Sequence, residues 1–142
     1  MLVIDASVYV ADARPRESHH AEARALLSWV VAKGESVCAP MIVLAEVASA
    51  ISRGTGSPIL ARRWVVALQG IPGLRFVPVD EILGRAAAEL AARHQIRGCD
   101  AVFVALAQQQ GATLITLDRQ QRERVPPDVV ACTPAEALVD VD

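Results

Sequence analysis

Short apolar runs alternate with longer segments of helical periodicity along the 142-residue chain. The runs cover residues 1–5, 36–39, 74–77, 112–117 and 129–132, and their length suits strands better than helices. Strands that are apolar throughout are covered on both faces, and their alternation with helices is typical of βαβ units. The sequence therefore predicts an α/β fold with a mainly parallel sheet between two helical layers.

Residues with capping preferences mark the helices that connect these strands. The expected helices cover residues 18–33, 40–53, 57–69, 80–94, 99–110 and 119–124. Ser18 is the expected N-cap of the first and Gly34 its stop, while Pro40 suits the first turn of the second, which should end at Gly54. No repeat, low-complexity segment or linker interrupts the pattern, so we expect one domain over residues 1–142.

The composition restricts the class of protein. Apolar residues make up 53% of the chain and the formal net charge is −2, which argues for a well-filled core and against non-specific coating of nucleic acid. No apolar stretch reaches the roughly 20 residues of a membrane span, and the first residues lack a signal-peptide pattern. We expect a cytoplasmic protein with no membrane partner. Its three separated cysteines, Cys38, Cys99 and Cys132, are expected to be buried thiols.

Two acidic residues directly follow predicted strands. Asp5 comes after the first apolar run and Asp118 after the run around Leu114. Ligands of open parallel sheets bind beyond the carboxyl ends of the strands, so these two carboxylates are candidates for one site. Each could equally be the N-cap of a following helix.

Two further acids border apolar helices. Glu46 is the only charged residue between Ser36 and Ser52, on a helix that we expect to be buried on most sides. A buried carboxylate needs a partner or a metal, although an exposed position on a narrow polar stripe is the alternative. Asp100 begins a strongly apolar helix, where it could face a cleft or serve only the helix N-terminus.

The four acids together suggest a metal site. Carboxylates brought close to one another repel unless a cation neutralises them. A set of oxygen ligands without His or Cys favours magnesium or manganese over zinc. Such a site suits hydrolysis of phosphodiesters, because the metal can acidify a water and stabilise charge on phosphate oxygens.

The same residues lie in four ordered motifs that resemble those of PIN-domain ribonucleases, and most closely the VapC-type toxins of toxin–antitoxin pairs. The motifs are LVIDAS at 2–7, PMIVLAEV at 40–47, RGCDAVFVALA at 97–107 and LITLD at 114–118. The ending CTPAEAL at 132–138 is also similar to that family's usual ending. The resemblance implies a three-layer α/β/α sandwich around a five-stranded parallel sheet and a magnesium-dependent endoribonuclease.

The resemblance also implies roles for individual residues. The acidic site residues would be Asp5, Glu46, Asp100 and Asp118. Asp5, Asp100 and Asp118 are the expected metal ligands, directly or through water, and Glu46 is a metal-shell group or general base. Ser7 and Thr116 match hydroxyl positions that orient the acids, although from the sequence alone they could be a cap and a strand residue. The implied partners are RNA, a cognate antitoxin and a second copy of the chain.

Other functions compete with this interpretation. A non-catalytic RNA- or protein-binding module would make the four acids incidental. A phosphatase or phosphotransfer enzyme on a doubly wound fold would want an acid where Ser7 stands, or a partner lysine, and the only lysine is Lys33. The arginines that follow Asp118, at positions 119, 122 and 124, could contact an RNA backbone or form a solvated helix face.

Overall fold

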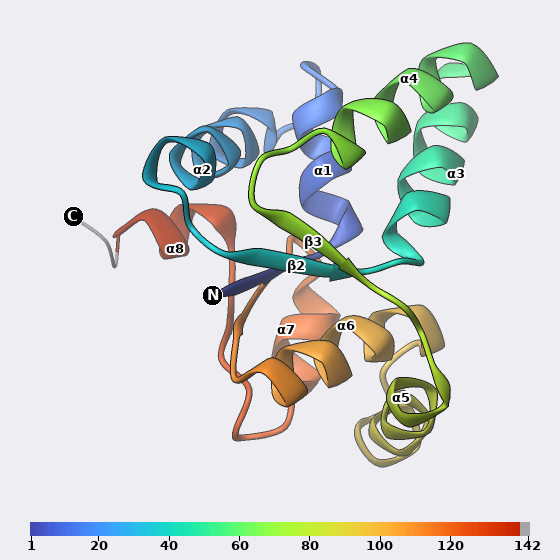
Figure 1. Ribbon diagram of the computed structural model, residues 1–142, viewed down its shortest axis with the longest axis vertical. Coiled ribbons are helices and arrows are strands. Elements are labelled where there is room, and N and C mark those ends of the chain that lie inside the picture. The colour runs from blue at the N-terminus through green and yellow to red at the C-terminus, as the bar shows by residue number, and fades with distance from the viewer. Residues whose placement is uncertain (140–142) are drawn as a thin grey trace.

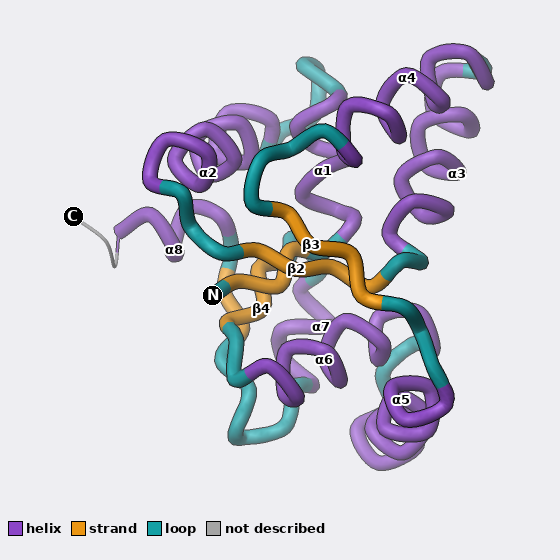
Figure 2. The backbone as a smooth tube through the Cα atoms, in the orientation of Figure 1, coloured by secondary structure: helices purple, strands orange, loops and turns teal. Residues whose placement is uncertain are grey.

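A computed structural model describes residues 1–139 and contains a five-stranded sheet in which every pair of neighbours is parallel. The strands are β1 (Leu2–Ile4), β2 (Val37–Pro40), β3 (Leu74–Val77), β4 (Thr113–Ile115) and β5 (Ala131–Cys132). Their order in the sheet is β3-β2-β1-β4-β5, and Figure 2 shows them as a twisted central layer. The predicted parallel sheet is confirmed, with β4 and β5 shorter than the sequence suggested.

Helices cover both faces of this sheet, as the continuous apolar strands predicted (Figure 1). One layer contains α1–α4 together with α8, and the opposite layer contains α5–α7. Their bounds are α1 Ala6–Ala13, α2 His20–Lys33, α3 Val43–Thr55, α4 Pro58–Gln69, α5 Glu81–His94, α6 Gly98–Gln110, α7 Arg119–Arg124 and α8 Pro134–Val139. The three-layer α/β/α sandwich is therefore confirmed.

The core is centred on β1 and α6. Every residue of α6 from 101 to 107 is buried, and this helix packs against β1, β2 and β4. Val3 and Ile4 of β1 have no exposed surface because the strand has neighbours on both edges and helices on both faces. Burial on all sides explains why these segments are apolar without a polar stripe.

The strand order creates a reversal point beside β1. The chain proceeds from β1 to β2 and β3 on one side, and then returns to place β4 and β5 on the other. The connections leaving β1 and β4 therefore diverge to opposite helical layers, which opens a crevice at their carboxyl ends. Asp5 and Asp118 both lie at this end of the sheet, close to where β1 and β4 terminate.

The second predicted helix differs from the observed α3 at both ends. Pro40 is not in a helix: it is the last residue of β2, opposite Val77, where the strand can tolerate its missing N–H. Gly54 does not end the helix either, because α3 continues to Thr55 and stops at Gly56, which has a left-handed φ of 70°. At Gly54 an added Cβ would lie 2.9 Å from Arg14 Nη1, so the end of the flexible Arg14 side chain would have to shift.

Two other helix starts were misjudged. Ser18 does not cap α2. The helix begins at His20 and its N-cap is His19, because the turns at residues 14–20 place Ser18 one residue before the capping position. Helix α8 was not predicted, although its start carries a capping box. Glu136 N donates to the Thr133 hydroxyl at 3.2 Å, while Thr133 N donates to the Glu136 carboxylate at 2.7 Å.

The cysteines differ from expectation too. Cys38 is buried, but Cys132 is only partly buried and Cys99 is exposed at the first turn of α6. The prediction of three buried thiols was therefore wrong for two of them. Within residues 1–139, no helix combines the length and apolar character needed to cross a bilayer.

Candidate active site

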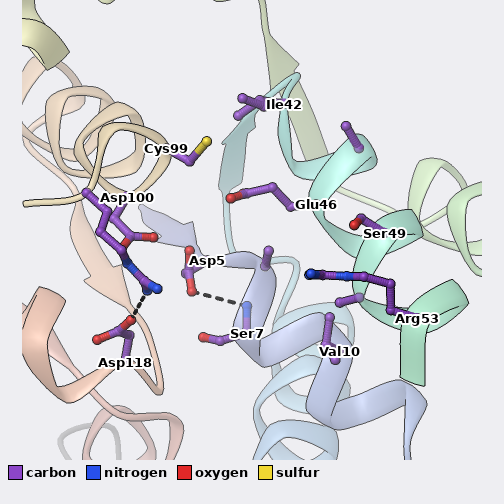
Figure 3. Close-up of a pocket in the computed structure, with 14 residues that line it drawn as sticks. Asp5, Ser7, Val10, Ile42, Glu46, Ser49, Arg53, Cys99, Asp100 and Asp118 are labelled. Atoms are coloured by element: carbon purple, nitrogen blue, oxygen red, sulfur yellow. Dashed lines mark hydrogen bonds and ion pairs between the residues drawn. The ribbon is translucent and has the colours of Figure 1, made fainter.

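A pocket of about 470 Å³ lies at the carboxyl ends of β1 and β4. All four acids singled out in the sequence line it, and they come from four separate segments of the chain: Asp5, Glu46, Asp100 and Asp118. Figure 3 shows Asp5, Glu46 and Asp100 with their carboxylates turned toward one another. The sheet topology thus brings together acids that lie up to 113 positions apart (118 − 5).

Asp5 combines the two roles that the sequence left as alternatives. It is the N-cap of α1, because its Oδ2 accepts a hydrogen bond from Ser7 N at 3.1 Å, and it also faces the pocket. Only 5% of its surface is exposed. This burial raises the pKa of Asp5 above its usual value, against the opposing effect of hydrogen bonds from Ser7 and Thr116.

The hydroxyls of Ser7 and Thr116 form a small network beneath the acids. Thr116 donates to Asp5 Oδ2 at 3.2 Å and accepts from Asp118 N at 3.0 Å. Ser7 Oγ lies 3.4 Å from the Thr116 hydroxyl and accepts from Leu117 N at 3.1 Å. These contacts fix the end of β4 against the start of α1, so both hydroxyls hold the loops that carry acids.

Glu46 projects from the first turn of α3 into the pocket. The buried stripe of that helix is limited to Val43, Val47 and Ile51, so α3 is not buried on most sides as expected, and Glu46 is half-buried beside the stripe. Among residues 1–139, its buried Oε2 finds no hydrogen-bond partner. Burial, followed by the charges of Asp5 and Asp100, raises the pKa of Glu46 to about 7, while Arg97 opposes the shift.

Asp100 and Asp118 occupy helix N-terminal positions that face the pocket. Asp100 lies in the first turn of α6, and Asp118 caps α7 by accepting from Gln121 N at 3.0 Å on its Oδ1. Both carboxylates are bound by Arg97, whose Nε lies 2.7 Å from Asp100 Oδ2 and whose Nη2 lies 2.5 Å from Asp118 Oδ2. The second contact is the dashed line that ends on Asp118 in Figure 3.

Arg97 was missed as a site residue. Its spacing from Asp100 is i, i+3, which is a usual ion-pair spacing at a helix surface and could have revealed the first contact. The contact with Asp118 joins residues 21 positions apart and depends on the approach of the start of α7 to the start of α6. That contact could not be read from local sequence.

The arginines after Asp118 are largely engaged within the fold. Arg122 donates to the carbonyl of Thr116 at 3.0 Å, Arg124 donates to the carbonyl of Gln95, and Arg119 pairs with Glu123 one turn along α7. Arg53 of α3, by contrast, extends into the pocket in Figure 3. It forms no hydrogen bond or ion pair with the part of the chain that the structure describes.

The donor atoms of the pocket fit a hard divalent cation. They are carboxylate oxygens, which such an ion prefers. Burial raises the pKa of both Asp5 and Glu46, and the buried Oε2 of Glu46 has no hydrogen-bond partner within residues 1–139. As they stand, however, no three acidic, His or Cys side chains within residues 1–139 are arranged to hold a metal. The set is suitable in chemistry, and binding would require the side chains to move.

A family model for the PIN domain matches residues 2–125. The chain belongs to the PIN domain family. The match includes all four pocket acids as well as Ser7 and Thr116, so the whole pocket lies inside the PIN region. No curated protein matches this PIN domain chain.

Solved structures share the PIN fold at low sequence identity. VapC20 of Mycobacterium tuberculosis, described as a sarcin-ricin loop cleaving toxin, aligns with a TM-score of 0.76 and 20% identity over 92% of this chain and 99% of its own. FitAcB of Neisseria gonorrhoeae aligns with a TM-score of 0.71 and 22% identity over 95% of this chain and 99% of its own. VapBC2 of Rickettsia felis, bound to a promoter DNA fragment, aligns with a TM-score of 0.72 and 15% identity over 93% of this chain and 97% of its own.

Proposed function

We propose that this PIN domain is a magnesium-dependent endoribonuclease and the toxin of a VapBC-type toxin–antitoxin pair. The observation that carries the proposal is the convergence of four carboxylates on one pocket, one of them with a buried oxygen that has no hydrogen-bond partner among residues 1–139. Clustered acids destabilise a fold unless they serve a cation, so a purely structural role does not explain them.

Asp5, Asp100 and Asp118 are the proposed magnesium or manganese ligands, directly or through water. When bound, the metal supplies a polarised water and charge stabilisation on the scissile phosphate. Asp5 suits an inner position because two hydrogen bonds fix its Oδ2 and leave Oδ1 for a ligand. Ser7 and Thr116 would hold Asp5 and Asp118 in position relative to each other through their hydrogen bonds.

Glu46 is the proposed proton acceptor of the site. Its pKa of about 7 lies in the range where a group can both take up and release a proton at neutral pH. Glu46 lines the pocket, and its buried Oε2 receives no hydrogen bond from residues 1–139. Arg53, which extends into the same pocket, supplies a positive charge for the phosphate backbone of the RNA.

The toxin assignment is supported by the relatives and by a second surface. VapC20 is described as a toxin, and another structural neighbour, from Klebsiella pneumoniae, is described as a toxin–antitoxin complex. A groove of about 580 Å³ between α3 and α4, lined largely by apolar residues, shares Ser49 with the acidic pocket. An antitoxin segment bound along this groove would reach the pocket and block it.

Homodimer formation and residence in the cytoplasm complete the proposal. Large apolar side chains, among them Ile59, Val66 and Ile82, are exposed on the isolated chain. A mean hydropathy of +0.33 also favours a protein that covers part of its surface with partners.

The decisive experiment is RNA cleavage by the purified chain with magnesium, with manganese and with chelator. We expect internal cleavage of RNA with either metal, none with chelator, and a rise in thermal stability as metal is added. Cleavage that persists in chelator would reject the metal mechanism. RNA binding without cleavage or a metal-dependent stability change would favour the non-catalytic binding module.

A further inference from the structure

The guanidinium of Arg97 lies between two of the proposed metal ligands. It contacts Asp100 Oδ2 at 2.7 Å and Asp118 Oδ2 at 2.5 Å, and so joins the first turn of α6 to the cap of α7. Both carboxylates are mostly buried, with side-chain exposures of 15% and 24%, whereas the Arg97 side chain is 68% exposed. A surface cation thus reaches inward to two pocket acids.

On Asp118, the oxygen that Arg97 holds is the one that a metal would need. Asp118 Oδ1 is occupied as the cap of α7 by Gln121 N, so Oδ2 is the oxygen that can serve a ligand. Arg97 binds this Oδ2. A divalent cation and the guanidinium therefore compete for the same lone pairs, because both bind carboxylate oxygens through positive charge.

Arg97 neutralises only part of the negative charge that the pocket acids carry. Its charge opposes the raised pKa of Glu46, so its field reaches across the pocket. It carries one charge against four carboxylates, and Glu46 Oε2 still lacks a partner among residues 1–139. The absence of a ready-made metal cluster from that part of the chain is consistent with two of the acids being held by Arg97.

Arg97 can leave this position at small cost. It occupies the N-cap position of α6 with an extended backbone and makes no side-chain cap hydrogen bond, so the helix does not depend on its side chain. Its exposed stem can rotate toward solvent without opening the core. Exposed ion pairs contribute little net stability, whereas a divalent ion binds several carboxylates at once.

We propose that Arg97 is an internal counter-cation that pairs with Asp100 and Asp118 in the metal-free protein and is displaced when the divalent metal binds. Arg97 thereby sets the metal affinity of the pocket and keeps the acids neutralised before metal arrives. The inference rests on the proposed function, because it assumes that the pocket binds a divalent cation.

Calorimetric titration of manganese into the full chain tests this exchange, with wild type compared to Arg97→Gln and Arg97→Lys. Removal of the competing charge should lower the manganese Kd about tenfold in Arg97→Gln. The manganese Kd of Arg97→Lys should lie between those of wild type and Arg97→Gln, since an ammonium group cannot bridge two carboxylates as the planar guanidinium does. The matched control is Arg53→Gln, which removes the same charge from the same pocket without breaking an ion pair, and should change the Kd by less than about threefold.

Thermal unfolding supplies a second measurement that does not depend on activity. Without metal, Arg97→Gln should melt below wild type, because Asp100 and Asp118 lose their counter-charge. Manganese should then raise its Tm more than that of wild type. Circular dichroism establishes that each variant is folded.

The outcomes separate the two proposals. Wild type that binds manganese while Arg97→Gln binds it equally or more weakly overturns the exchange and leaves the metal site intact. An equal gain in manganese affinity in Arg97→Gln and Arg53→Gln also overturns the exchange. The gain would then come from the overall electrostatic potential of the pocket rather than from the ion pairs of Arg97. Failure of every variant to bind manganese overturns the metal site and the exchange together.

Discussion

Thr116 donates its hydroxyl hydrogen to Asp5 Oδ2 at 3.2 Å, although the two residues are 111 positions apart in the chain. The same hydroxyl oxygen accepts from Asp118 N at 3.0 Å. One fully buried side chain therefore orients two acids of the pocket, one after β1 and one after β4. The position of each acid depends on the pairing of these two strands.

Replacing Thr116 with valine should damage this arrangement while keeping the shape of the side chain. We expect a loss of about 1–3 kcal/mol in the free energy of unfolding, because Asp5 loses a donor and Asp118 N loses an acceptor in a buried site. RNA cleavage should fall at least about tenfold. Thr116→Ser keeps the hydroxyl and should retain most activity despite some lost packing; a fully active valine variant would contradict the positioning role.

Asn substitutions at Asp5 and Asp100 test the proposed ligands. Each removes a negative charge and leaves a side chain of nearly the same size, so the fold should persist while magnesium-dependent cleavage drops by about 100-fold or more. The measurement is RNA cleavage at saturating magnesium, with circular dichroism as the check on folding. Full activity in either variant would remove that residue from the mechanism.

Glu46 should make the protein less stable as the pH rises. Its pKa is about 7 in the fold and 4.5 for the free group, so between these values the folded state binds more protons than the unfolded state. The free energy of unfolding then decreases with pH across this interval. Glu46→Gln cannot ionise and should be more stable than wild type by about 1–2 kcal/mol above pH 7, after allowance for solvent screening of a half-buried group.

Chemical denaturation at several pH values measures this difference. The advantage of Glu46→Gln should shrink as the pH falls below 7 and vanish below about 4.5, where the wild-type group is protonated in both states. A constant difference across the whole range would show that the gain is unrelated to ionisation.

Cys99 offers a probe of the pocket because it is exposed and lines the same cavity. Partial burial, and then the charges of Glu46 and Asp100, raise the pKa of its thiol. A bound metal would cancel those charges, so manganese should accelerate alkylation of Cys99 by iodoacetamide about three- to tenfold. Peptide mass mapping measures the alkylation of Cys99. The control is Asp100→Asn, which should bind metal poorly and therefore show little acceleration by manganese.

The sequence predicted the elements that local patterns determine. Continuous apolar runs identified the strands, and the N-cap role considered for Asp5 and Asp118 is confirmed, because a capping carboxylate is a local feature. Pro40 was misjudged because proline suits both a helix start and a strand end, and only pairing with β3 decides between them.

The pocket could be predicted only as a set of acids. Strand-end positions suggested that Asp5 and Asp118 meet, and the parallel sheet confirms that they line one cavity. The bridge from Arg97 to Asp118 was missed, since it depends on how closely the start of α7 approaches the start of α6. The partial exposure of Glu46 was also misjudged, because an apolar helix sequence does not reveal which of its sides forms the wall of a pocket.

The central position of β1 has a consequence for the order of events during synthesis. β1 is made first, yet its neighbour β4 is completed only at Ile115, and the loop carrying Asp118 follows. A growing chain on the ribosome therefore has most of its helices before it can close the sheet and assemble the pocket. Under the proposed function, the nascent chain could not cleave RNA before Asp118 has been made, because the pocket lacks one of its four acids until then.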